Sequence, residues 1–187
     1  MIHDLDDTLK ELLVQKVPLD PNAIDIKFEV PNKEDWNPKP NKPTINCFLY
    51  DLRENHELRS NERYLSRNGT TGTEKIAPTR MDLSYMITVW TTDVADEHQL
   101  LGNILKTVLS YPILPSEVLK GEIANQPLPL RAWVSQPERT PNAWDFWGIT
   151  EGRMKAGISY IITVAVEPFA PIDVRLVTEK VLKVESK

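Results

Sequence analysis

The chain has 187 residues, of which 41% are hydrophobic and 26% charged, as expected of one globular domain. Its net charge of −5 at pH 7 argues against a general nucleic-acid binder, which carries a basic excess. No stretch approaches the ~18 apolar residues of a membrane span, and the acidic start is unlike a secretory signal. We therefore expect a cytoplasmic protein that binds neither nucleic acid nor membrane.

The N-terminal quarter of the chain shows two kinds of hydrophobic periodicity. Residues 2–17 carry apolar side chains at helical spacing, which predicts an amphipathic helix that ends at Pro18. Residues 24–30 alternate between apolar and polar side chains, which predicts a half-buried strand. After a connection rich in Pro, Asn and Lys over 31–43, residues 44–53 are apolar on both faces and predict a strand inside the sheet.

Residues 54–78 lack a sustained apolar pattern, and we interpret them as a long irregular excursion. Long loops in compact domains are usually functional or disordered. This one is also basic, because four arginines fall in it or beside it: Arg53, Arg59, Arg63 and Arg67.

The clearest strand pattern of the chain covers residues 81–89. A second amphipathic helix is predicted to follow at once and to end at Pro112, with Thr92 or Asp93 as its N-cap. Two further strands are predicted over 128–134 and 156–166.

The predicted order is α-β-β-β-α-β-β, which favours an α+β fold with a mostly antiparallel mixed sheet. We expect the two main helices to pack on one face of that sheet. Residues 1–170 are predicted to form a single domain, and residues 171–187 a C-terminal extended arm or last strand. The pattern in the tail fits a strand or a helix, and we favour the extended form.

The sequence offers little for catalysis. Its three histidines are scattered, and the one acidic cluster near a histidine, Asp93, Glu97 and His98, is better interpreted as a helix N-terminus with charges that suit the helix dipole. The single cysteine, Cys47, lies in an apolar run and is expected to be a buried structural thiol. We predict no catalytic residue, no metal ligand and no cofactor, and hence no enzyme.

The aromatic cluster of Trp144, Phe146 and Trp147 is a better candidate for function. Large aromatic side chains next to a turn-rich segment either fill a core or anchor an interface. The sequence leaves both interpretations open.

Three segments together resemble one known family: PTINCFLYDLREN over 43–55, RMDLSYMITVWT over 80–91 and DEHQLLG over 96–102. They are similar to the cap, or tail-terminator, proteins of extracellular contractile injection systems of the antifeeding-prophage type. The N-terminal helix and the late strand that begins at Gly157 fit the same family. None of these segments is catalytic, so the combination carries the resemblance.

The resemblance implies a fold related to phage tail terminators, assembled as a homo-oligomeric ring that we expect to be a hexamer. Such a ring sits on the last layer of the inner tube and contractile sheath, ends polymerisation and holds sheath to tube. The partners would be other copies of the chain, the inner tube protein and the sheath protein. Some members of the family carry a further C-terminal domain, and the resemblance extends no role of that domain to this chain.

The function implied by this resemblance suggests roles for the candidate interface residues. Arg59, Arg63 and Arg67 become candidates for contact with the tube or a neighbouring subunit. Val174 and Leu176, in the C-terminal arm, become candidates for donating or accepting a strand, as sheath subunits do. The aromatic side chains named above become candidate anchors between subunits.

Three other functions stay open at this point. The first is a different tail-completion or baseplate connector protein. The second is an adaptor that loads cargo, and the third is a small enzyme that uses the cluster at Asp93.

Overall fold

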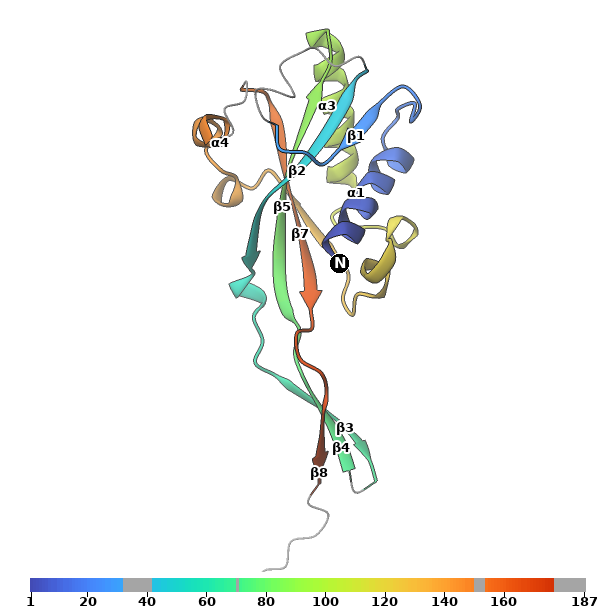
Figure 1. Ribbon diagram of the computed structural model, residues 1–187, viewed down its shortest axis with the longest axis vertical. Coiled ribbons are helices and arrows are strands. Elements are labelled where there is room, and N and C mark those ends of the chain that lie inside the picture. Colours follow the sequence, from blue (N-terminus) through green and yellow to red (C-terminus); the bar gives the residue numbers. More distant parts are fainter. Residues whose placement is uncertain (32–41, 70, 150–153, 177–187) are drawn as a thin grey trace, which may run out of the picture.

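The molecule contains two β-sheets, one of which extends from the end of the other (Figure 1). The computed structural model describes residues 1–31, 42–69, 71–149 and 154–176. The body contains a five-stranded sheet in the order β1-β2-β5-β7-β6, with bounds Asp25–Lys27, Thr44–Glu54, Thr79–Trp90, Gly157–Val166 and Arg131–Val134. A three-stranded sheet in the order β3-β4-β8 projects from one end of this body, with bounds Arg63–Asn68, Thr71–Ile76 and Ile172–Arg175. We call this second sheet the arm.

The arm is built from the continuation of body strands. β3 follows β2 along the chain, β4 leads directly into β5, and β8 follows β7, so the same three segments cross from body to arm (Figure 1). All pairings in both sheets are antiparallel except that of β1 with β2. The predicted mixed and mostly antiparallel sheet is therefore confirmed.

Helices α1 (Ile2–Lys16) and α3 (Val94–Ser110) cover one face of the body sheet (Figure 1). The short 3-10 helices η2 (Ser116–Val118) and η3 (Gly121–Asn125) pack beside α1. Leucines of α1 meet the strand side chains of this face in one continuous core, which includes Leu5, Leu9, Leu12, Leu13, Ile45, Cys47, Tyr85, Ile104, Val108, Tyr160 and Ile162. The prediction of an α+β fold with both main helices on one face is confirmed.

Local chemistry sets the ends of both helices. Helix α1 stops before Pro18, where Val17 turns to an extended conformation and its amide donates to the Leu13 carbonyl. At the start of α3, the Asp93 carboxylate accepts from the amides of Ala95 and Asp96 at 2.8 and 3.3 Å. Of the two predicted caps, Asp93 therefore fills the role.

The opposite face of the sheet is only partly covered. A short helix, α4 (Ala143–Ile149), lies over its upper end in Figure 1 and packs Phe146 and Trp147 against a second small core, whose other members are Phe48, Tyr50, Met86 and Trp90. No helix in the described residues is long and apolar enough to cross a bilayer.

The interpretation of residues 54–78 as an irregular excursion is wrong. The segment forms the 3-10 helix η1 (His56–Leu58) and the β3–β4 hairpin. Its alternation escapes notice because all of β3 is exposed, so that no buried face demands apolar residues at every second position. Backbone pairing with β4 holds the strand in place.

Three further elements differ from their predicted bounds. The strand predicted over 24–30 pairs only at Asp25–Lys27, and the one predicted over 128–134 begins at Arg131, after Pro129. The segment around Trp144 is a short helix, which no pattern had suggested. In the tail, the favoured extended form is confirmed over Ile172–Arg175, whereas residues 177–187 lie outside the described residues.

One glycine fixes how η3 approaches α1. Gly121 has a φ of +50°, which disfavours any residue with a side chain, and a Cβ there would lie 2.5 Å from the Cγ of Asp4. Asp4 in turn binds the N-terminal amine at 2.7 Å. A larger residue at this position would strain the backbone and displace this ion pair.

Candidate assembly surfaces

One face of the arm sheet carries most of its apolar side chains, together with Arg63, Arg67 and Glu74, and we call it the apolar face; the other face is more polar. The pairing register places Leu65, Ile172 and Val174 on the same side of its sheet, and Leu65 and Leu176 reach over Gly72, which is buried beneath them. Leu65 is 47% exposed and Ile172 is 57% exposed. Nothing in the described subunit covers this face, and exposed apolar faces of this kind mark contact sites between proteins.

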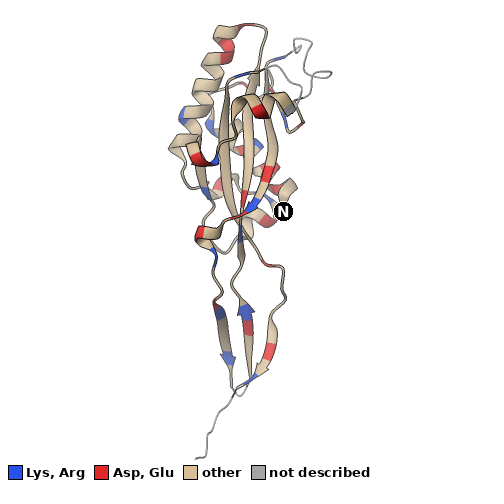
Figure 2. Ribbon diagram, turned by 90° about the vertical axis from the view of Figure 1, so that its left-hand side faces the viewer, with Lys and Arg blue, Asp and Glu red and all other residues tan. Residues whose placement is uncertain are grey.

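The arm is also basic within an acidic chain. Its three strands carry four basic and two acidic side chains, whereas the whole chain has a net charge of −5. Figure 2 shows the blue segments of Lys and Arg along these strands. Arg63 is 3.0 Å from Glu74 on the neighbouring strand, while Arg67 makes no ion pair within the described subunit. The arm therefore offers positive charge to an acidic partner surface.

Both outer edges of the arm sheet lack a paired strand among the described residues. β4 lies in the middle, so that β3 and β8 each leave one row of backbone groups unpaired in the described subunit. Such edges accept a strand from another chain. Val174 lies on the β8 edge strand and Leu176 directly after it, both half-buried, so the predicted strand-exchange residues are at an available edge.

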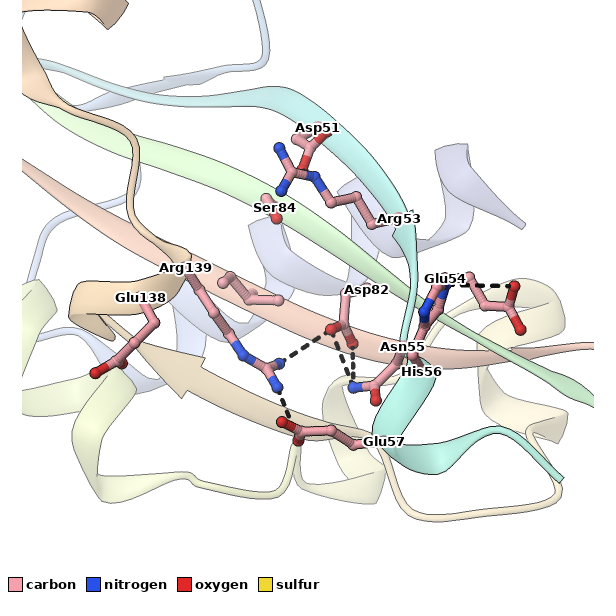
Figure 3. A pocket seen from close by; sticks show the side chains of 11 residues that line it. Asp51, Arg53, Glu54, Asn55, His56, Glu57, Asp82, Ser84, Glu138 and Arg139 are labelled. Carbon is pink, nitrogen blue, oxygen red and sulfur yellow. Dashed lines mark hydrogen bonds and ion pairs between the residues drawn. The ribbon is translucent and has the colours of Figure 1, made fainter.

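A polar network around Asp82 fixes the root of the arm (Figure 3). The Asp82 carboxylate, whose side chain is 13% exposed, accepts from the Thr163 hydroxyl at 2.6 Å, the Arg139 guanidinium at 3.0 Å and the Asn55 amide at 3.0 Å. These donors come from β7, from the 3-10 helix η4 (Pro137–Arg139) and from the residue that follows β2, respectively. One carboxylate thus joins three segments that are distant in sequence.

Two members of this network, Arg139 and Asn55, make further contacts around the root of the arm. Arg139 also pairs with Glu57 of η1 at 3.1 Å and lies over the Trp133 ring, with 5.5 Å to its centroid. The Asn55 side chain accepts from the Leu58 amide, while its backbone amide donates to the Arg80 carbonyl. These contacts therefore hold the segment that leads from β2 into the arm. An open hollow of about 240 Å³ lies beside it.

Arg59 belongs to this root as well. Its guanidinium makes a two-pronged ion pair with Glu54, with both N–O distances 2.7 Å. The hydrogen bonds and the positive charge of Arg59 lower the pKa of the Glu54 carboxyl below its ordinary value. Of the three predicted arginines, Arg59 therefore ties the arm to the body, whereas Arg63 and Arg67 lie out along it.

The structure divides the aromatic cluster. Phe146 and Trp147 are 7% and 5% exposed and pack inside the subunit, where Trp147 meets Trp90 with 6.5 Å between ring centroids. Trp144 points outward and, at 75%, is the most exposed large apolar side chain of the described residues. Only Trp144 is thus placed to contact a partner directly, and its role in an interface stays a prediction.

The acidic cluster at the start of α3 does not form a site. Asp93 caps the helix, Glu97 pairs with Lys155, and His98 is exposed to solvent. The interpretation as a helix N-terminus is therefore confirmed. The described residues contain no group of three His, Cys, Asp or Glu side chains placed to hold a metal ion.

Cys47 lies fully buried in the main core, where burial raises the pKa of its thiol far above the ordinary value. A thiol in this environment stays protonated and unreactive at neutral pH. The predicted structural role of Cys47 is confirmed.

The residues of the arm root were missed by sequence reasoning. Asp82 carried a signal, since it is the one charged residue in the strand pattern over 81–89. Asn55 and Arg139 carried none, because both lie in polar segments and become partners of Asp82 only through the fold.

The fold is that of terminator proteins of contractile injection systems. It resembles the PVC sheath/tube terminator of an extracellular contractile injection system, solved in the extended state, with a TM-score of 0.72, 20% sequence identity, and coverage of 100% of this chain and 64% of that one. It also resembles the tube-terminating cap of the anti-feeding prophage, with a TM-score of 0.73, 20% identity, and coverage of 100% of this chain and 62% of that one. This chain thus spans less than two thirds of the length of either protein.

Residues 4–178 match the family described as the Pvc16 N-terminal domain, and the chain belongs to this family. The resemblance found in the sequence is thereby confirmed in family and in fold. No curated protein matches the chain.

Proposed function

We propose that this protein is a structural cap of a phage-tail-like contractile injection system. It forms a ring on the end of the inner tube and sheath, ends their polymerisation and ties one to the other. Membership in the Pvc16 N-terminal domain family carries this proposal, together with a fold shared over the whole chain with a sheath/tube terminator and a tube-terminating cap. The subunits are expected to assemble in the cytoplasm as a hexamer.

The surfaces of the subunit support a role in contacts. Within the described part of the chain, the arm exposes its apolar face and two unpaired edges, which are features that a soluble monomer usually covers or shortens. The hydrogen bonds around Asp82 hold the base of the arm on the body, so that the arm keeps its direction relative to the body. We infer that the arm is the part that engages the tube, the sheath or a neighbouring subunit.

Capping also follows from the physics of stacked polymers. The end of a tube exposes surfaces that the next layer would otherwise cover. A ring that binds these surfaces, and offers no copy of them on its far side, stops growth. Closed rings need head-to-tail contacts between identical subunits, so each subunit must carry two different complementary patches.

The function requires contacts and no turnover, and we propose that the protein is not an enzyme. The cluster at the start of α3, the one candidate for catalysis in the sequence, is engaged in capping and ion pairing instead.

The proposal is tested by electron microscopy of particles from cells that lack this protein. Loss of a cap leaves tubes and sheaths of irregular length, and wild-type protein restores a uniform length. Absence of any assembled tube would instead indicate a baseplate connector, and particles of normal length would contradict capping altogether.

A matched pair of variants tests the role of the arm. Leu65→Asp places a charge on the apolar face, whereas Ser66→Asp makes the same change on the polar face one residue away. Both positions are exposed, but the new carboxylate at position 65 lies opposite Glu74, so circular dichroism must show that both variants fold. We expect Leu65→Asp to give irregular particle lengths and Ser66→Asp to give uniform ones. Equal performance of the two would remove the apolar face from the interface.

A further inference from the structure

A second hollow lies at the arm root, next to the Asp82 network. It has a volume of about 400 Å³, which is large enough for a large side chain together with part of its neighbour. Its walls are mostly apolar and come from η1, β3, the β4–β5 junction and the segment before β6: Leu58, Tyr64, Ala77, Pro78, Leu128 and Pro129. Two arginines, Arg80 and Arg131, supply the charge.

Neither of these arginines has an anionic partner among the described residues. Arg80 is only 8% exposed, and its Nε lies buried without a hydrogen-bond partner in the described structure. No described carboxylate lies within ion-pair distance of Arg80 or Arg131, although Asp82 is close enough to attract Arg80 electrostatically. Burial and the neighbouring Arg131 lower the pKa of Arg80. Since an unpaired buried donor destabilises a protein, the hollow has the features of an incomplete anion site.

A complementary feature lies elsewhere on the same chain. Helix α4 presents Trp144, 75% exposed, next to the exposed carboxylate of Asp145. The Asp145 carboxylate makes neither a hydrogen bond nor an ion pair with any described residue. Phe146 and Trp147 anchor the helix beneath them in the small core, which holds the outward pair in place.

The two features do not meet within the described subunit, since neither Trp144 nor Asp145 lines the hollow. Trp147 packs on Trp90 at one end of β5, and Arg80 lies near the other end of the same strand. Phe146 of the same helix packs on Tyr50, beside the middle of β5, from which the strand spans roughly 15 Å to Arg80. A contact between α4 and the hollow therefore has to join two copies, and it joins different patches head to tail, as a ring requires.

We propose that Trp144 and Asp145 of one copy insert into the hollow between Arg80 and Arg131 of the next copy. The Asp145 carboxylate completes the anion site, and the indole ring covers the apolar wall of Tyr64, Leu128 and Pro129. A buried aromatic anchor beside a charge pair is the usual composition of an energetic centre in an interface. This inference rests on the proposed ring and names the contact that closes it.

A charge exchange tests the pairing directly. Asp145→Arg and Arg131→Glu each place two like charges in the contact, and the double variant restores opposite charges between positions 145 and 131 while Arg80 keeps its charge. Both side chains are exposed in the free subunit, so all three variants are expected to fold. Lys106→Glu, an exposed site on α3, gives the control for a change of charge alone.

The readout is the mass of the purified full chain as a function of its concentration, followed by sedimentation, with circular dichroism to verify folding. Each single variant should weaken assembly by about 30-fold or more, since breaking an interfacial charge pair has a large effect. The double variant should recover part of the affinity that Asp145→Arg loses, since Arg80 still repels the new positive charge, and Lys106→Glu should assemble like wild type. Unchanged assembly in the single variants, or no recovery in the double variant, overturns the proposal.

A truncation pair tests the aromatic anchor. Trp144→Ala should weaken assembly, while Leu109→Ala, at an exposed apolar position of α3, should not. Equal assembly of the two variants contradicts the anchor.

The outcome for this contact is distinguishable from the outcome for capping. If charge-exchanged variants assemble normally and still give uniform particle lengths, the pairing is wrong and the cap function stands. If the wild-type protein stays monomeric and particles without it keep a uniform length, the cap function and the pairing fall together.

Discussion

The hydrogen bonds of Asp82 at the root of the arm predict how much stability the Asp82→Ala variant loses. This carboxylate is largely buried and accepts from Asn55, Arg139 and Thr163 at 2.6 to 3.0 Å. Asp82→Ala removes the acceptor of all these hydrogen bonds at once. It leaves a guanidinium, a hydroxyl and a carboxamide without their partner.

The size of the effect follows from the charge and burial of the Asp82 carboxylate. A hydrogen bond to a charged group contributes about 1.5–3 kcal/mol, and removing one member of a buried charge pair costs about 3–5 kcal/mol. The contributions do not add fully, because one carboxylate serves all the donors and water from the open hollow can replace some of its hydrogen bonds. We therefore expect Asp82→Ala to lower the free energy of unfolding by about 3–4 kcal/mol.

The assay is equilibrium unfolding in urea at pH 7, with Asp51→Ala as the matched control. Asp51 lines the same hollow, but its only ion pair among the described residues is with the largely exposed Arg53. A pair of this kind contributes about 0–1 kcal/mol. Equal unfolding free energies for the two variants would refute the assignment of Asp82 as the centre of the root.

Three further predictions concern other parts of the subunit. Trp147→Ala should destabilise the protein by about 3–5 kcal/mol in urea unfolding, because it empties the small core under α4; a destabilisation below about 1 kcal/mol would contradict that core. Gly121→Ala should lower the unfolding free energy by about 1–3 kcal/mol, through its positive φ and the contact with α1, and an unchanged thermal midpoint would contradict the strain. The Glu54→Gln variant should lose stability relative to wild type at pH 7, because Arg59 lowers the pKa of Glu54 in the folded state. The difference should shrink steadily as the pH falls below the ordinary value of 4.5 and through the lowered pKa, and a difference that does not change with pH would exclude the ion pair as its cause.

The sequence was sufficient for elements that have one buried face. The leucines of α1 and the alternation of β5 and β7 gave correct types and nearly correct bounds, since burial on one side imposes a period of 3.6 or 2. The cap at Asp93 was equally local.

The arm was not predicted because β3 has no buried face to impose such a period. Tyr64 and Leu65 follow each other in a strand with both faces in solvent, so no periodic pattern marks it. Its structure depends on pairing with β4 and, through β4, with β8, which lies about 100 residues further along the chain.

The candidate contact residues could be predicted only in part from the sequence. Trp144 was identifiable as one of a set of aromatic residues, but only the fold separates it from the buried Phe146 and Trp147. Arg80 and Arg131 come together through strand register across β7, and no spacing in the sequence indicates that they share a hollow.

The most direct test of the cap function is the position of this protein on the native particle, determined by cryo-electron microscopy with a tag on the chain. We expect a closed ring of this protein at the end of the tube and sheath away from the baseplate, and nowhere else along them. Protein found along the whole length of the tube, at the baseplate, or absent from complete particles would show that it is not a cap.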